Sequence, residues 1–222
     1  MIELQNISKV YKSINGKTDA LTNVCLTIRE GEFVCIMGKS GSGKTTLLNI
    51  IGCMDKANSG EYRLDDIDVV GLNANKFDKL RREKISFIFQ KYELMGKYTV
   101  YENIELPMNA KRISGKQKKQ RITDIMKRLG IYELRNKFPK QLSGGEQQRV
   151  AIARAYVSDN KYILADEPTG ALDNKNTQEI MNIFEELRQE GKTIVLVTHD
   201  EEIAARGNRI IQLLDGRIDE HP

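Results

Sequence analysis

The sequence predicts an α/β fold with a mostly parallel central sheet and an inserted helical subdomain. Short apolar runs rich in β-forming residues alternate along the chain with stretches of helical periodicity. This alternation is what a parallel sheet with covering helices requires. The region from about residue 92 to residue 160 lies between two such runs and contains an apolar helical repeat, so we expect the helical subdomain there.

The first elements are short β-like segments at residues 2–10, 20–28 and 61–64. Residues 32–37 form an apolar run between two glycines, which predicts a strand, and the apolar residues from Thr46 onward predict a buried helix. The glycine-rich loop between them therefore connects a strand to a helix.

Two later helices are predicted by apolar residues three and four positions apart. The first lies in the insertion and is otherwise basic, while the second ends at Gly191 and precedes a strand at residues 193–197. The inward stripes are Ile122, Ile125, Met126 and Leu129 in the first helix and Ile180, Ile183, Phe184 and Leu187 in the second.

Composition favours a single domain over residues 1–222, because the 222 residues suffice for one core and contain no internal repeat or low-complexity tract. The net charge of +4 is mild and no basic-aromatic tract is present, so no direct nucleic acid partner is expected. No apolar run approaches the roughly 20 residues that cross a bilayer, and no N-terminal signal is visible. We therefore expect no membrane-spanning segment in this chain.

The three cysteines, Cys25, Cys35 and Cys53, are widely spaced among apolar residues. This pattern predicts reduced, buried thiols in a cytosolic compartment instead of a metal site or disulfide framework.

Residues 38–46, GKSGSGKTT, match the phosphate-binding pattern GxxxxGK[ST] with Gly38, Gly43, Lys44 and Thr45 in the required places. Glycines allow the backbone amides to approach phosphate oxygens closely, and the following helix adds its positive end. Lys44 supplies a cation for the outer phosphates, and the Thr45 hydroxyl can reach Mg²⁺. A plain glycine-rich turn is the alternative, and the strand-loop-helix context disfavours it.

Residues 161–167 predict a buried parallel strand that ends in two carboxylates, Asp166 and Glu167. We expect Asp166 to hold Mg²⁺ through water, and Glu167 to polarise a water for attack on a γ-phosphate. A solvated strand end is the alternative interpretation of such a pair.

Further motifs complete a recognisable order: Gln90 after a strand at residues 85–89, LSGGEQQR at 142–149, Ala-Leu-Asp at 171–173 and Thr-His-Asp at 198–200. Over essentially all of its length the chain resembles the ATP-binding subunit of ABC transporters. This resemblance implies the P-loop NTPase fold of ABC ATPases, with a small antiparallel β subdomain built from the N-terminal β-like segments.

The resemblance assigns Ser143, Gly144 and Gly145 to the γ-phosphate of an ATP held by the other subunit of a homodimer. The residues themselves are suited to this role, because Ser143 is a good helix N-cap and the glycine amides form an anion site at the positive end of the helix. Taken alone, Ser-Gly-Gly would be only a turn.

By the same resemblance, Gln90 bridges Mg²⁺ or the attacking water to residues 91–99, which contact the membrane partner. His199 contacts the γ-phosphate and orders the attacking water, which leaves Glu167 as the general base. Asp173 helps to align the opposing subunit.

Tyr11 follows the first predicted strand and matches the family position whose ring stacks on adenine, although an aromatic at a strand end is commonly part of the core. The resemblance thus implies ATP and Mg²⁺ as ligands. Its catalytic residues are Lys44, Gln90, Glu167 and His199, its Mg²⁺ ligands are Thr45, Gln90 and Asp166, and its nucleotide contacts are Tyr11, Gly38, Lys39, Ser40, Gly41, Ser42, Gly43, Lys44, Thr45, Thr46, Ser143, Gly144, Gly145 and Asp173.

The segments ADEPTGALD, FQKY and LLDGRI resemble the MacB- and LolD-like branch, whose members work with permeases that carry extracytoplasmic domains. This implies a peripheral protein at the cytoplasmic face of the cell membrane that serves export, antimicrobial peptide resistance, or lipoprotein or peptide mechanotransmission. The alternatives are an FtsE-like cell-division ATPase and a soluble ABC protein that acts on ribosomes or DNA. A small-molecule kinase would leave LSGGEQQR unexplained.

Overall fold

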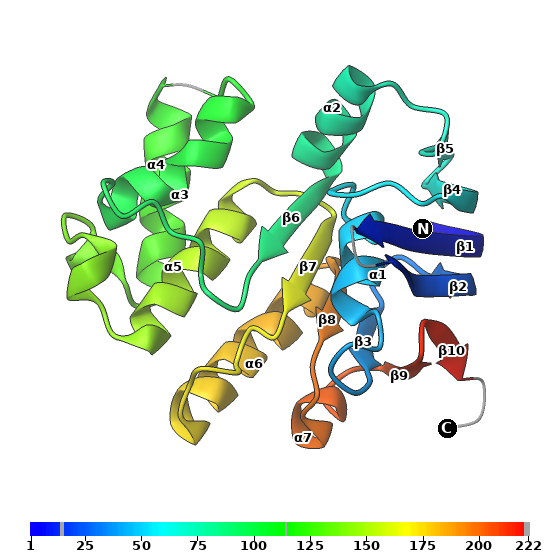
Figure 1. Cartoon of the computed structure of the whole chain (residues 1–222). Helices are drawn as coiled ribbons and strands as arrows, with labels where there is room; N and C mark the ends of the chain where they lie inside the picture. Colours follow the sequence, from blue (N-terminus) through cyan, green and yellow to red (C-terminus); the bar gives the residue numbers. More distant parts are fainter. Residues whose placement is uncertain (14–15, 114, 220–222) are drawn as a thin grey trace.

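A computed structural model describes residues 1–13, 16–113 and 115–219 and places two sheets side by side (Figure 1). The larger sheet has the order β10-β9-β3-β8-β7-β6, and every pair in it is parallel except β10 with β9. The prediction of a mostly parallel sheet is therefore confirmed. Its strands are β3 (Phe33–Met37), β6 (Ile85–Ile88), β7 (Tyr162–Asp166), β8 (Thr193–Val197), β9 (Arg209–Leu214) and β10 (Arg217–Asp219).

The smaller sheet is antiparallel in the order β2-β1-β4-β5 and confirms the β subdomain. Its first strand continues three residues beyond the predicted end, so Tyr11 lies inside the strand and pairs with Thr18. Pairing with β2 resumes after register shifts, and this hydrogen bonding extends the strand past its apolar run. The bounds are β1 (Ile2–Ser13), β2 (Gly16–Ile28), β4 (Ser59–Leu64) and β5 (Ile67–Asp68).

Helices cover the larger sheet, and three of them form a separate lobe, at the left of Figure 1. In the described part of residues 92–160, all regular elements are helical. The lobe contains α3 (Val100–Ala110), α4 (Gly115–Arg128) and α5 (Gly144–Val157), with the short 3-10 helices η1 (Tyr132–Leu134) and η2 (Pro139–Gln141). The remaining helices are α1 (Lys44–Ile51), α2 (Ala74–Lys84), α6 (Asn174–Gln189) and α7 (Glu201–Ala204).

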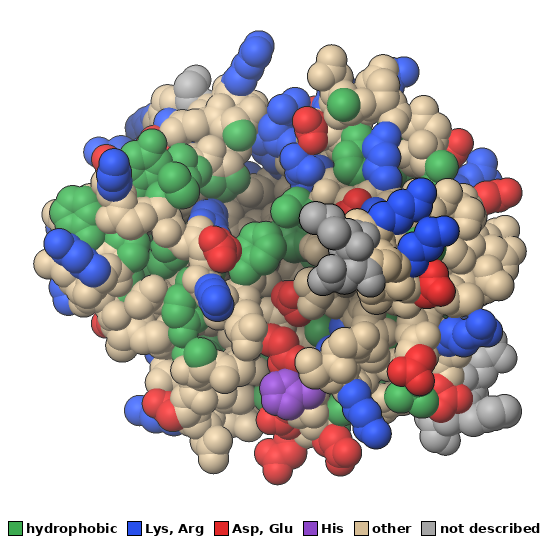
Figure 2. All heavy atoms as spheres, viewed as in Figure 1, with side chains coloured by type: hydrophobic (Ala, Val, Ile, Leu, Met, Phe, Trp, Pro, Cys, Tyr) green, Lys and Arg blue, Asp and Glu red, His purple; other side chains and the backbone are tan. Residues whose placement is uncertain are grey.

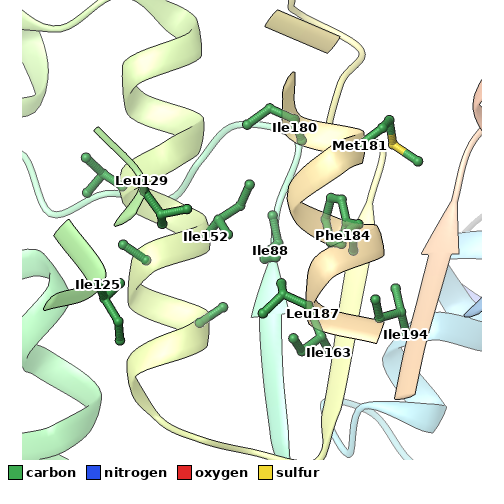
Figure 3. Packing of buried hydrophobic residues seen from close by; sticks show 14 of the residues in the cluster. Ile88, Ile125, Leu129, Ile152, Ile163, Ile180, Met181, Phe184, Leu187 and Ile194 are labelled. Carbon is green, nitrogen blue, oxygen red and sulfur yellow. The ribbon is translucent and has the colours of Figure 1, made fainter. Parts of the chain in front are cut away.

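The core has two parts. One joins the lobe and α6 to the sheet, where Ile125 of α4, Ile152 of α5 and Phe184 of α6 belong to a single buried cluster (Figure 3). The other packs α1 between the two sheets, with Leu47 and Leu48 fully buried. Each fully buried side chain of this size stabilises the fold by about 1.5–3 kcal/mol. This packing holds the carboxyl ends of the parallel strands next to the start of α1.

Cys35 and Cys53 are buried, and burial raises the pKa of each thiol to about 12. The prediction for Cys25 is wrong, because this thiol is exposed. The physical reason is strand alternation: Val24 and Leu26 face the core, so Cys25 between them faces outward. Among the described residues, no helix is long and apolar enough to cross a membrane.

Candidate nucleotide-binding and catalytic site

The glycine-rich loop joins β3 to α1, as the sequence predicts. Gly43 adopts a left-handed conformation with φ of 100°, and a Cβ atom there would lie 2.3 Å from the carbonyl oxygen of Ala20. At Gly38 a Cβ atom would lie 2.2 Å from the carbonyl oxygen of Leu213. No side chain caps the N-terminus of α1, so its first amides are free to bind an anion. Glycine is therefore required at both positions for the loop to adopt this anion-binding conformation.

Lys44 and Thr45 begin α1 and point back into the loop and toward β7. The Lys44 ammonium donates to the carbonyl oxygens of Gly38, at 2.7 Å, and Lys39, at 2.9 Å. The Thr45 hydroxyl donates to Oδ2 of Asp166 at 3.1 Å. A cation therefore already lies over the loop where phosphate oxygens would bind.

A cavity of about 720 Å³ opens in front of this loop. The carboxyl ends of the parallel strands supply one of its walls, which is where open α/β sheets bind ligands. The β1–β2 hairpin supplies another wall. The lining residues are Tyr11, Thr18, Asp19, Ala20, Ser40, Gly41, Gly43, Lys44, Thr45, Thr46, Gln90, Asp166, Glu167, Val197 and His199.

Thr18, Asp19 and Ala20 also line the cavity although no motif predicts them, because β2 pairs with β1 beside Tyr11. These residues belong to no motif. The pairing of Tyr11 with Thr18 that brings them there becomes visible only once the register of the hairpin is known.

Glu167 and His199 meet at the ends of β7 and β8. The backbone amide of Glu167 donates to the carbonyl oxygen of Val197 at 2.9 Å, and the residue adopts a left-handed φ of 47°. Its Oε1 lies 2.9 Å from Nδ1 of His199. This hydrogen bond, with the carboxylate charge, raises the pKa of His199. The pair therefore presents a carboxylate and an imidazole to the same point of the cavity.

Asp166 is suited to hold a divalent cation. Burial, and then the neighbouring charge of Glu167, raises the pKa of Asp166. A bound cation would offset both effects, and the oxygens of Thr45 and Gln90 line the same cavity. Hydroxyl, carboxylate and amide oxygens are the donors that Mg²⁺ prefers. The residues present therefore fit Mg²⁺.

The signature segment lies at the start of α5, outside this cavity. Ser143 caps the helix, with its hydroxyl accepting from the amide of Glu146 while the Glu146 carboxylate accepts from the amide of Ser143 at 2.7 Å. This arrangement agrees with the expected N-cap. A Cβ atom at Gly145 would lie 2.3 Å from Oδ1 of Asn176, which shows how closely α5 approaches α6.

Asp173 caps α6 beside this segment, accepting from the amide of Asn176 at 2.8 Å. Neither Asp173 nor the residues Ser143, Gly144 and Gly145 line the cavity that contains the phosphate loop. The structure thus brings most of the predicted site residues together in two groups on one chain, whereas Gly38, Lys39 and Ser42 belong to the phosphate loop but do not line the cavity.

A family model described as ABC transporter matches residues 21–170. The chain is an ATP-binding domain of the ABC transporter family. It is 49% identical over 224 residues to MJ0796 of Methanocaldococcus jannaschii, an uncharacterised ABC transporter ATP-binding protein, covering 99% of this chain and 95% of that protein. It is 46% identical over 218 residues to the macrolide export protein MacB 1/2 of Paracoccus denitrificans. That match covers 98% of this chain and 33% of the relative, so the ABC domain spans about a third of MacB.

Solved structures agree with this assignment. The dimeric MJ0796 cassette in a post-hydrolysis state with ADP and Pi superposes with a TM-score of 0.93 at 46% identity, covering 99% of this chain and 97% of that one. The cbiO1 protein of Clostridium perfringens superposes with a TM-score of 0.86 at 29% identity, covering 98% of this chain and 86% of that one. The protein is therefore an ABC ATPase of the group that includes MacB and MJ0796.

Proposed function

We propose that two copies of this ABC ATPase close around two ATP-Mg²⁺ and thereby drive a separate membrane permease of the MacB- or LolD-like type. One observation carries the proposal: Ser143, Gly144 and Gly145 lie at the start of α5 and do not line the cavity of their own chain. A helix start with glycine amides is an anion site that a second copy can use. The dimeric state of the MJ0796 neighbour supports this arrangement.

In this mechanism the loop amides and Lys44 bind the triphosphate, and Thr45, Asp166 and Gln90 would hold Mg²⁺, which would supply neutralisation of the phosphate charge. Glu167 accepts a proton from the attacking water. His199 is placed by Glu167, through the contact of 2.9 Å, to order that water against the γ-phosphate. Closure drives the partner, and hydrolysis allows the dimer to reopen.

The permease is proposed to bind in a groove of about 350 Å³ where the lobe of α3, α4 and α5 meets α2 and β6. Its floor is apolar, with Phe87, Leu106 and Pro107, its rim carries the exposed Arg82, and Arg154 lines it from α5. Figure 2 shows a hollow between the lobe and the rest of the molecule, with Lys and Arg side chains gathered over α2 beside it. An apolar floor with a cationic rim favours a helical segment that carries both apolar and acidic residues.

Of the three arginines that line the groove, Arg81 forms an ion pair with Asp78 at 2.9 Å. Within residues 1–13, 16–113 and 115–219, no carboxylate forms an ion pair with Arg82 or Arg154. Arg154 instead donates to the carbonyl oxygens of Tyr92, at 2.8 Å, and Glu93, at 2.5 Å. These two residues directly follow Gln90 and its neighbour Lys91. A partner in the groove would thus act on the backbone segment that leads to the proposed Mg²⁺ ligand.

The same segment, residues 91–99, offers apolar surface beside the groove. Met95 is 52% exposed and Tyr98 is 40% exposed. The side chain of Asn103 holds the segment, accepting from the amide of Met95 at 2.7 Å and donating to three of its carbonyl groups. This segment supports the expected contact with a membrane protein at the cytoplasmic face of the cell membrane.

The groove is tested by purifying Glu167→Gln chains from membranes with ATP and identifying the integral membrane protein that accompanies them. We expect a permease with a large extracytoplasmic domain. Arg82→Glu should reduce its recovery at least about tenfold, because like charges placed together cost several kcal/mol at an interface. Arg63→Glu, on the exposed face of β4, is the matched control. Recovery of ribosomes or DNA without membrane protein would contradict the proposal.

A further inference from the structure

Tyr11 is held by an ion pair that belongs to none of the motifs above. Its hydroxyl donates to Oδ2 of Asp55 at 2.8 Å. The other carboxylate oxygen of Asp55 accepts from the Lys9 ammonium at 2.7 Å, and that ammonium lies 5.0 Å from the centroid of the Tyr11 ring. Lys9 and Tyr11 are two residues apart on β1 and therefore lie on the same face of the strand.

Lys9 is an unusual lysine because only 8% of the residue is exposed. It also donates to the carbonyl oxygen of Lys56 at 2.7 Å. Lysine is rarely buried unless it is paired. Partial burial opposes ionisation of Asp55, but hydrogen bonds from Lys9 and Tyr11 outweigh it and lower the pKa of that carboxyl. Asp55 is thus a charged acceptor at neutral pH.

The hydrogen bond between Tyr11 and Asp55 connects Tyr11 to the helix that starts at the phosphate loop. Asp55 lies just beyond α1, and the amides of Met54 and Asp55 donate to the carbonyl oxygen of Asn49 at 2.8 and 3.2 Å. Tyr11 is therefore joined through Asp55 to the far end of the helix whose first residues are Lys44 and Thr45.

The ring of Tyr11 remains available for contact with a ligand. Tyr11 is 42% exposed and lines the cavity, while its hydroxyl end is bonded to Asp55. The Lys9 ammonium lies over one face of the ring, which leaves the opposite face for a flat ligand.

We propose that Asp55, itself held by Lys9, is a positioning residue that orients the Tyr11 ring for the nucleobase before ATP binds. The inference rests on the ATP binding of the proposed function and on the stacking of Tyr11 on adenine that the family resemblance implies. An unrestrained ring loses rotational freedom when the base binds, whereas a ring already held by Asp55 has lost it beforehand. The rival explanation is that Asp55 and Lys9 only join β1 to the end of α1.

The decisive variant is Tyr11→Phe, which keeps a ring able to stack and removes only the hydroxyl that Asp55 holds. Isothermal titration calorimetry should show ATP affinity falling about threefold to tenfold, the range expected for immobilising one side chain on binding. Affinity for inorganic tripolyphosphate should not change. Tyr132→Phe, at a tyrosine of η1 outside the cavity, is the matched control. Unchanged ATP affinity in Tyr11→Phe would overturn the proposal.

Asp55→Ala should give the same selective loss of ATP affinity, and combining it with Tyr11→Phe should lower that affinity no further, because each variant removes the hydrogen bond between Tyr11 and Asp55. Independent losses that multiply in the double variant would overturn the proposal in favour of the structural explanation. Comparing ATP with tripolyphosphate distinguishes a failure of the Asp55 proposal from a failure of the proposed function. Wild-type protein that binds neither ligand would contradict the nucleotide site, whereas equal affinity for both would remove only the base contact and with it the role of Asp55.

Discussion

Glu167→Gln is expected to bind ATP with nearly unchanged affinity while its turnover falls by about 10²-fold or more, the range for removal of a general base. Glutamine keeps the size of the side chain and can still hydrogen-bond to His199, but it cannot accept the proton of the attacking water. Glu167 lines the cavity beside the phosphate loop, with its Oε1 2.9 Å from Nδ1 of His199. Steady-state phosphate release and equilibrium ATP titration measure the two effects separately.

Glu201→Gln is the matched control for this variant, since Glu201 is an exposed carboxylate at the start of α7, two residues beyond His199. Its turnover should equal that of wild type. Wild-type turnover in Glu167→Gln would remove Glu167 from the role of base and would leave His199 as the next candidate.

Lys44→Ala is expected to weaken ATP binding by at least about tenfold, because charged hydrogen bonds contribute roughly 1.5–3 kcal/mol each. In the structure the ammonium is held over the loop by the carbonyl oxygens of Gly38 and Lys39, at 2.7 and 2.9 Å. Without it, those carbonyl groups would face the phosphates with no cation between them. A fluorescent ATP analogue titrated into both proteins provides the comparison.

Lys17→Ala removes an exposed lysine of β2 and controls for the change in net charge. It should bind ATP as wild type does. Equal affinity in Lys44→Ala and wild type would contradict the assignment of the phosphate loop.

The phosphate loop, the acidic strand end and the signature could be predicted from sequence because each is a local pattern with a local physical cause. Gly43 illustrates this, since its φ of 100° is a left-handed backbone conformation that residues with a Cβ atom rarely adopt. The parallel strands could also be predicted from sequence, since all five residues of β3 and of β8 are apolar or β-branched and all are buried.

What could not be predicted depends on contacts between segments distant in sequence. Asp55 and Tyr11 are 44 residues apart, and only the fold places them within 2.8 Å. Arg154 likewise meets the carbonyl groups of Tyr92 and Glu93 only because α5 packs behind that segment. Cys25 shows the converse error: apolar neighbours suggested burial, while the register of an edge strand turned the thiol outward.

The proposed ATP site between the phosphate loop of one copy and Ser143 of the other is tested most directly by the mass of Glu167→Gln in solution. This mass is measured by sedimentation with ADP and with ATP. A chain of 25.3 kDa should be monomeric with ADP and should double in mass with ATP, because each Ser143 would bind the nucleotide of the other copy. Adding Ser143→Arg to the same chain should abolish the dimer while ATP still binds. A monomer at saturating ATP, or a dimer unaffected by Ser143→Arg, would contradict the account.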